Sequence, residues 1–161
     1  MKKELEKAIE LRNNGDYQES NKLLIKLVEN DPNDAFINYQ CAWSFDVLGE
    51  ESRAVPYYEK AIRLGLSGKE LEGALLGLGS TYRTLGEYEK SQETFLKGIK
   101  IFPNNMAIQA FYSMTLYNLN EYSAAMELLL KCLVDTTSDK DILQYRKAID
   151  FYADKLDNVW E

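Results

Sequence analysis

Apolar and small residues recur along most of the chain at the spacing of an amphipathic helix. The pattern is clearest between residues 72 and 105, where two stripes flank a break at Gly86. The first stripe consists of Leu75, Leu78, Gly79, Tyr82 and Leu85, and the second of Ser91, Phe95, Gly98 and Ile99. Because residues three and four apart share one face of a helix, this segment is predicted to form a helix-turn-helix pair.

The break recurs at regular intervals. The phrases NNGDYQES, VLGEESRA, TLGEYEKS and NLNEYSAA place Gly15, Gly49, Gly86 and Asn120 at equivalent pivots, separated by 34, 37 and 34 residues. Glycine adopts left-handed backbone freely and asparagine tolerates it best among the other residues, so each pivot is predicted to take a positive φ. Self-similarity at this period indicates a stack of helical repeats.

We therefore expect a single domain over residues 1–161, with four helix-turn-helix units at 1–34, 35–71, 72–105 and 106–139. The second unit is the longest because Lys69, Glu70 and Leu71 are inserted after Ser67 and Gly68, and these residues are predicted to lengthen the connection. Residues 140–161 carry a stripe that predicts one capping helix over the last unit. Its N-cap is Ser138 or Asp139, and its stripe is Ile142, Tyr145, Ile149, Tyr152, Leu156 and Val159.

Small residues mark the places where the two helices of a unit meet. They are Ala8, Ala42, Gly79 and Ser113 in the first helices, and Ser20, Ala54, Ser91 and Ala125 in the second helices. Two helices approach closely only where both side chains are small. Tyr82, Tyr88 and Tyr122 are also expected in the core, and Cys41 and Cys132 are expected to be buried and unreactive.

These features resemble the tetratricopeptide repeat family. The resemblance covers residues 1–139 and is most specific in the third unit, where the signature positions hold Leu78, Gly79, Tyr82, Gly86, Tyr88, Phe95 and Pro103. The signature opens with a tryptophan, and this chain departs from it in all four units. The residues at that position are Glu4, Asn38, Leu75 and Gln109. The resemblance implies an all-α fold, a right-handed α-α superhelix of four units plus a capping helix, and a role as a non-catalytic interaction scaffold or adaptor.

The resemblance also implies that the second, fifth, ninth and twelfth positions of each unit face a concave groove. The candidate peptide-binding residues chosen from these positions are Leu5, Ile9, Arg12, Phe36, Tyr39, Trp43, Leu76, Arg83, Met114 and Tyr117. The best-known groove in the family clamps terminal carboxylates with Lys and Asn at the fifth and ninth positions. Apolar and aromatic residues occupy those positions in the first two units, so a different class of ligand is expected.

Exposed aromatic side chains are costly to leave in water, so we expect the groove to be covered. The first hypothesis is that an apolar or aromatic peptide, or an amphipathic helix, fills it, with Tyr39 and Trp43 as anchors and Arg12 or Arg83 orienting an acidic group. A second interpretation makes Trp43 and Phe36 part of the core. A third is self-association, in which a second copy in a homodimer, or the chain's own C-terminal helix, fills the groove.

Composition argues against most other functions. The chain has 19 Lys and Arg against 26 Asp and Glu, a net charge of -7, so nucleic acid and membrane surfaces are not expected partners. It has no histidine, which excludes histidine-based catalysis and metal sites, and it lacks a P-loop. We expect no enzymatic activity, no cofactor and no metal. Two distant cysteines and the lack of a long apolar run favour the cytoplasm.

Overall fold

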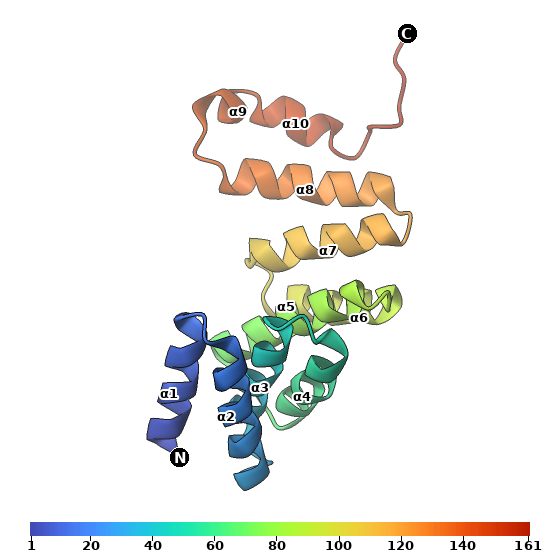
Figure 1. The fold of residues 1–161 in the computed structure, drawn as a ribbon. Coiled ribbons are helices and arrows are strands. Elements are labelled where there is room, and N and C mark those ends of the chain that lie inside the picture. The colour runs from blue at the N-terminus through green and yellow to red at the C-terminus, as the bar shows by residue number, and fades with distance from the viewer. The chain divides into compact units, whose positions relative to one another are not determined.

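The computed structural model describes residues 1–161, which form ten α-helices and no strands (Figure 1). They divide into two compact units, Met1–Glu87 and Tyr88–Glu161. The first unit contains α1 (Lys2–Asn13), α2 (Tyr17–Asn30), α3 (Ala35–Asp46), α4 (Glu51–Arg63) and α5 (Gly68–Thr84). The second contains α6 (Tyr88–Ile101), α7 (Met106–Asn118), α8 (Tyr122–Thr136), α9 (Lys140–Gln144) and α10 (Arg146–Tyr152). No helix combines the length and the apolar character needed to cross a bilayer.

The four pivots have the backbone conformation that their spacing predicts. The φ angles are 89° at Gly15, 71° at Gly49, 78° at Gly86 and 64° at Asn120. Each pivot lies two or three residues after the last residue of a first helix. At Gly49, for example, the pivot amide donates to the carbonyl of Asp46 at 3.0 Å. The left-handed residue thus closes the C-terminus of the preceding helix.

The small residues bring the paired helices into contact, as expected. Ser20 on α2 donates a hydrogen bond to the carbonyl of Ala8 on α1 at 2.7 Å, and both residues are fully buried. Ala42 on α3 and Ala54 on α4 are likewise 0% exposed. The helices α1 and α2, and likewise α3 and α4, therefore pack closely at these positions.

The inserted residues do not lengthen the connection before α5, contrary to the prediction. They extend the helix, which begins at Gly68 and runs for 17 residues. Lys, Glu and Leu all favour helix, and Lys69 adds an ion pair with Glu72 at 2.6 Å. Gly65 and Gly68 have positive φ and confine the turn to the residues just before this extension.

The C-terminal segment also differs from the prediction of a single helix at 140–161. It forms two short helices, because the chain bends at Tyr145, and the last helix ends at Tyr152. Arg146 donates to the carbonyl of Val134 at 3.3 Å and pairs with Asp135, which fastens the start of α10 to the end of α8. The predicted N-cap is confirmed, since the Asp139 side chain accepts from the amides of Asp141 and Ile142 at 3.0 Å.

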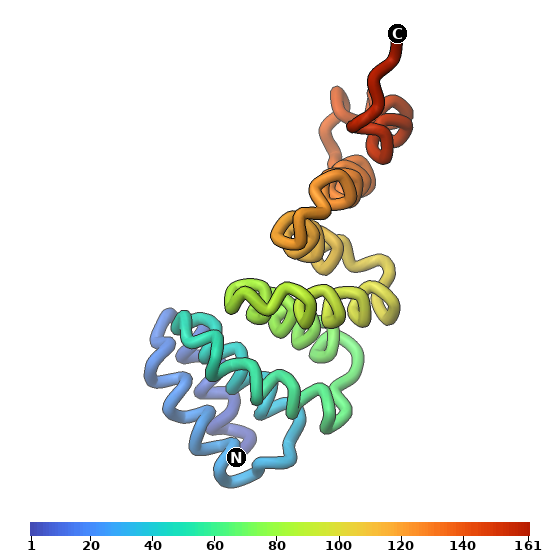
Figure 2. Tube along the Cα trace, turned by 90° about the vertical axis from the view of Figure 1, so that its right-hand side faces the viewer, coloured from blue at the N-terminus to red at the C-terminus, as the bar shows by residue number.

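Figure 1 and Figure 2 show how this segment lies in the second unit. In both views α7 and α8 are side by side, and α9 and α10 lie on the far side of α8 from α7. The segment packs against α8 through α10 and has no comparable contact with α7. It therefore covers one side of the last helix pair.

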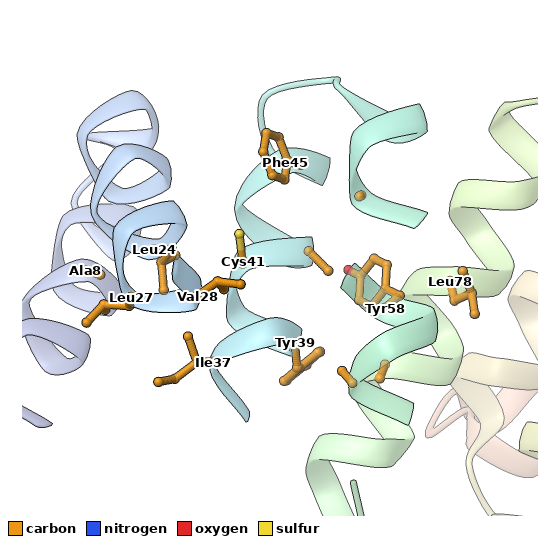
Figure 3. Packing of buried hydrophobic residues seen from close by; sticks show 14 of the residues in the cluster. Ala8, Leu24, Leu27, Val28, Ile37, Tyr39, Cys41, Phe45, Tyr58 and Leu78 are labelled. Atoms are coloured by element: carbon orange, nitrogen blue, oxygen red, sulfur yellow. The ribbon is translucent and has the colours of Figure 1, made fainter. Parts of the chain in front are cut away.

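The core of the first unit gathers side chains from consecutive helices (Figure 3). Leu24, Leu27 and Val28 of α2 lie opposite Ile37 and Cys41 of α3. Burial raises the pKa of the Cys41 thiol to about 12, which leaves it protonated at neutral pH. The expectation that Cys41 and Cys132 are buried is confirmed.

Candidate peptide-binding surface

Trp43 is the large aromatic side chain that α3 leaves at the surface. The helix starts at Asp34, whose carboxylate accepts from the amide of Ile37 at 2.8 Å, and most of its other residues are buried. Trp43 is 41% exposed. Its ring stacks on Tyr39 with centroids 6.1 Å apart, and the guanidinium carbon of Arg12 lies 3.8 Å from its centroid. These contacts fix the indole in one orientation.

Arg12 lies beneath this indole and is not an exposed cation. It is 5% exposed, and its Nη2 donates to Oε1 of Gln40 at 2.6 Å. Burial lowers the pKa of its guanidinium from the ordinary value. Of the two arginines predicted to orient an acidic group of a ligand, Arg12 is therefore excluded, because its guanidinium is covered and already bonded to the protein.

Tyr39 is also buried, at 9% exposure, so its predicted role as an anchor for a ligand is wrong. The ring fits over Gly73 of α5, where a methyl group would lie 2.2 Å from the Tyr39 hydroxyl oxygen. Burial raises the pKa of Tyr39. Glycine at a groove position of the next repeat was the signal for this burial, since it leaves room for a large neighbour.

A partly buried polar network lies next to the Tyr39 ring. Asp46, at the end of α3, accepts hydrogen bonds from the Tyr58 hydroxyl at 2.6 Å and from the Thr81 hydroxyl at 2.9 Å. Desolvation raises the pKa of the Asp46 carboxyl, and the two hydrogen bonds oppose that shift. Burial and the nearby carboxylate raise the pKa of Tyr58. The network ties α3, α4 and α5 together within the first unit.

Gln40, Tyr58 and Thr81 were not singled out in the sequence. Asp46 occupies the twelfth position of its helix-turn-helix unit, but no hydrogen bonds were predicted for it. A single carboxylate that ends the apolar helix AFINYQCAWSFD, with hydroxyl groups on the next two helices, is the pattern that points to such a network.

Some of the other predicted groove residues lie beside Tyr39 and Trp43 and are only partly exposed. The rest lie apart from these two residues. Phe36 is half-buried, with its ring centroid 6.3 Å from that of Tyr39. It lines a shallow hollow of about 540 Å³ together with Asp34, Leu66 and Glu70. Leu5, Ile9, Leu76 and Arg83 are all half-buried in the first unit. Met114 and Tyr117 belong to α7 of the second unit and are 41% and 62% exposed.

The chemistry of the Trp43 surface is apolar and aromatic. Arg12, the cation beneath the indole, is covered, and the exposed group is the Trp43 ring itself. No three carboxylate or thiol side chains of the chain are grouped as metal ligands would be. The arrangement fits contact with apolar side chains.

Comparison with known proteins agrees with the helical pairs. Residues 35–156 match the family described as "Tetratrico peptide repeat". The chain belongs to the tetratricopeptide repeat family. Members of this family are in general non-catalytic protein-interaction modules. The prediction of the family from the pivots and the small residues is confirmed.

Individual relatives are distant. Superkiller protein 3 of Saccharomyces cerevisiae is 27% identical over 105 residues, which is 61% of this chain but only 7% of that protein. Among solved structures, MamA 41-end from Desulfovibrio magneticus RS-1 has a TM-score of 0.76 at 15% identity, covering 95% of this chain and 85% of that chain. YrrB has a TM-score of 0.71 at 16% identity, covering 94% and 77%. These likenesses establish the solenoid fold of stacked helical repeats.

Proposed function

We propose that this protein is a non-catalytic scaffold that binds an apolar or aromatic peptide, or the apolar face of an amphipathic helix, on the surface around Trp43. The observation that carries the proposal is an indole that is exposed yet held in place by Arg12 and Tyr39. A ring fixed in this way loses little conformational entropy when a ligand covers it. Tryptophan is also among the residues that contribute most to binding energy in interfaces.

The comparisons support this proposal through the family and its fold. The YrrB structure is described as that of a tetratricopeptide repeat protein with an unusual peptide-binding site. The structure of Naa15/Naa10 is described as bound to HypK-THB, and it has a TM-score of 0.63 to this chain. The net charge of -7 disfavours nucleic acid as the partner, and the two buried free thiols fit a reducing cytoplasm.

The test is a selection of peptides from a random display library on the purified protein. The affinity of the selected peptides is then measured by calorimetry for the wild type and for Trp43→Ala. We expect Trp43→Ala to weaken binding at least about tenfold. Tyr17→Ala is the matched control, because Tyr17 has nearly the same exposure, 42%, on a different helix.

Equal affinities for the wild type and Trp43→Ala would refute this surface as the site. Circular dichroism establishes that both variants keep their helices. Self-association is the alternative occupant, in which a second copy covers the surface. It is favoured if sedimentation finds a wild-type dimer that Trp43→Ala dissociates.

A further inference from the structure

The second helix of every repeat presents one face defined by its distance from the pivot. The residues two, six, nine and thirteen positions after the pivot are three or four residues apart, so they form one stripe along the helix. In α8 this stripe consists of Tyr122, Met126, Leu129 and Leu133, and we call it the α8 stripe. The residue nine positions after the pivot is Leu24 in α2, Tyr58 in α4 and Phe95 in α6.

In the three earlier second helices the following first helix covers the middle of this face, although Tyr17 at its start on α2 is 42% exposed. α3 packs on α2, α5 packs on α4 and α7 packs on α6. Leu24, Tyr58 and Phe95 are accordingly 0%, 2% and 0% exposed. On α6 the covering contact comes from Tyr112 of α7, whose ring centroid is 6.3 Å from that of Phe95. The face is thus the packing site of one helix, which we call its seat.

In α8 the same seat is open. Tyr122, Met126, Leu129 and Leu133 are 53%, 48%, 43% and 41% exposed, so the expectation that Tyr122 is in the core is wrong. The C-terminal segment packs beside the stripe. Ser123 donates to Asp157, and the carbonyl of Val134 accepts from Arg146. These two contacts lie about 100° or more around the helix from Tyr122.

Charge around the α8 stripe indicates what could occupy it. From Glu121 to Glu161 the chain has nine acidic and five basic residues. Three of the basic side chains already pair with acidic neighbours, Lys131 with Glu127, Arg146 with Asp135 and Lys155 with Asp154. On α8 itself the only cation is Lys131. This part of the chain therefore carries net negative charge, which attracts cationic partners.

We propose that the α8 stripe is the docking site for an amphipathic helix with basic flanks from another protein, seated as the first helix of a further repeat would be. This site is separate from the Trp43 surface. The α1 helix of a second copy does not fit the seat, because its exposed residues include Lys3, Glu6, Lys7 and Glu10. Two α8 stripes meeting about a twofold axis would bring like charges together.

The probe is a stapled peptide of α7, the helix that covers the equivalent seat on α6. Its three exposed residues, Ala107, Met114 and Tyr117, are replaced by lysine in one peptide and by glutamate in a matched peptide. Binding is measured by fluorescence anisotropy. We expect the lysine peptide to bind at least about tenfold more tightly than the glutamate peptide.

The protein variant Leu129→Glu should weaken the lysine peptide at least about tenfold, because it places a buried charge in the interface. The control is Leu96→Glu, since Leu96 is 47% exposed on α6 and lies outside the α8 stripe. No binding up to about 1 mM peptide, equal binding of the two peptides, or equal loss in the two variants would overturn the proposal. A wild-type dimer that Leu129→Glu dissociates would also overturn it, with a second copy as the occupant.

Discussion

The two units are built from the same repeat but bury their apolar residues to different extents. The first unit has sixteen buried apolar residues and five large apolar side chains that are exposed, whereas the second has seven and fifteen. Every second helix of the first unit has a following first helix to cover it, and α8 has none in the equivalent place. The repeat pattern therefore determines where the helices form, while the presence of a following helix determines how many apolar side chains are buried.

Equivalent twelfth positions show the same contrast at the level of single residues. Arg12 is buried beneath Trp43, and the half-buried Asp46 accepts two hydrogen bonds from other helices of the first unit. Tyr117 holds this position in α7 and is 62% exposed, in edge contact with Tyr122. The same register position thus holds hydrogen-bonded polar side chains in the first unit and an exposed aromatic side chain in the second.

The largest expected effect compares the two cores directly. Phe45 on α3 and Leu116 on α7 occupy the same register position and are 1% and 8% exposed. Phe45→Ala should lower the free energy of unfolding by about 3–5 kcal/mol, and Leu116→Ala by about 2 kcal/mol, because the looser core loses less packing. Urea unfolding followed by circular dichroism measures both. An equal or larger cost at Leu116 would contradict the contrast between the cores.

A smaller effect is expected at the twelfth positions. Arg12→Lys keeps the charge but loses the planar contact with Trp43 and the hydrogen bonds to Gln40, so it should cost about 1–3 kcal/mol. Tyr117→Ala should change stability by less than about 0.5 kcal/mol, because it removes an exposed side chain. Thermal unfolding of the two variants measures both effects. Similar losses of unfolding free energy would contradict the difference between the two positions.

The smallest expected effect is a pH dependence specific to the first unit. Burial raises the pKa of Asp46 in the folded protein, so the folded state holds this proton at a pH where the unfolded chain has lost it. Asp46 should therefore add stability below its ordinary pKa of about 4, and this contribution should be lost as the pH rises through the raised value. The difference in unfolding free energy between the wild type and Asp46→Asn, measured from about pH 4 to 7, should fall with pH. A flat or rising difference would contradict it.

Much of the helical organisation could be predicted from the sequence because it depends on local signals. Left-handed pivots and small contact residues act within one helix pair, and Gly15, Gly49, Gly86 and Asn120 all behave as expected. The exposure of the aromatic residues depends on the next helix. Tyr39 is buried because Gly73 leaves it room, and Trp43 stays exposed one turn further along. The bend at Tyr145 likewise follows a tertiary contact of Arg146 with α8.

The two tryptophans fall one in each unit. Trp43 stands over a guanidinium in the first, and Trp160 lies in edge contact with Tyr152 in the second, with ring centroids 5.5 Å apart. Each is an intrinsic fluorophore with its own surroundings. In a Trp160→Phe variant the tryptophan emission comes from the first unit alone, and in a Trp43→Phe variant it comes from the second alone. The chain thus carries a built-in optical label for following the melting of each half.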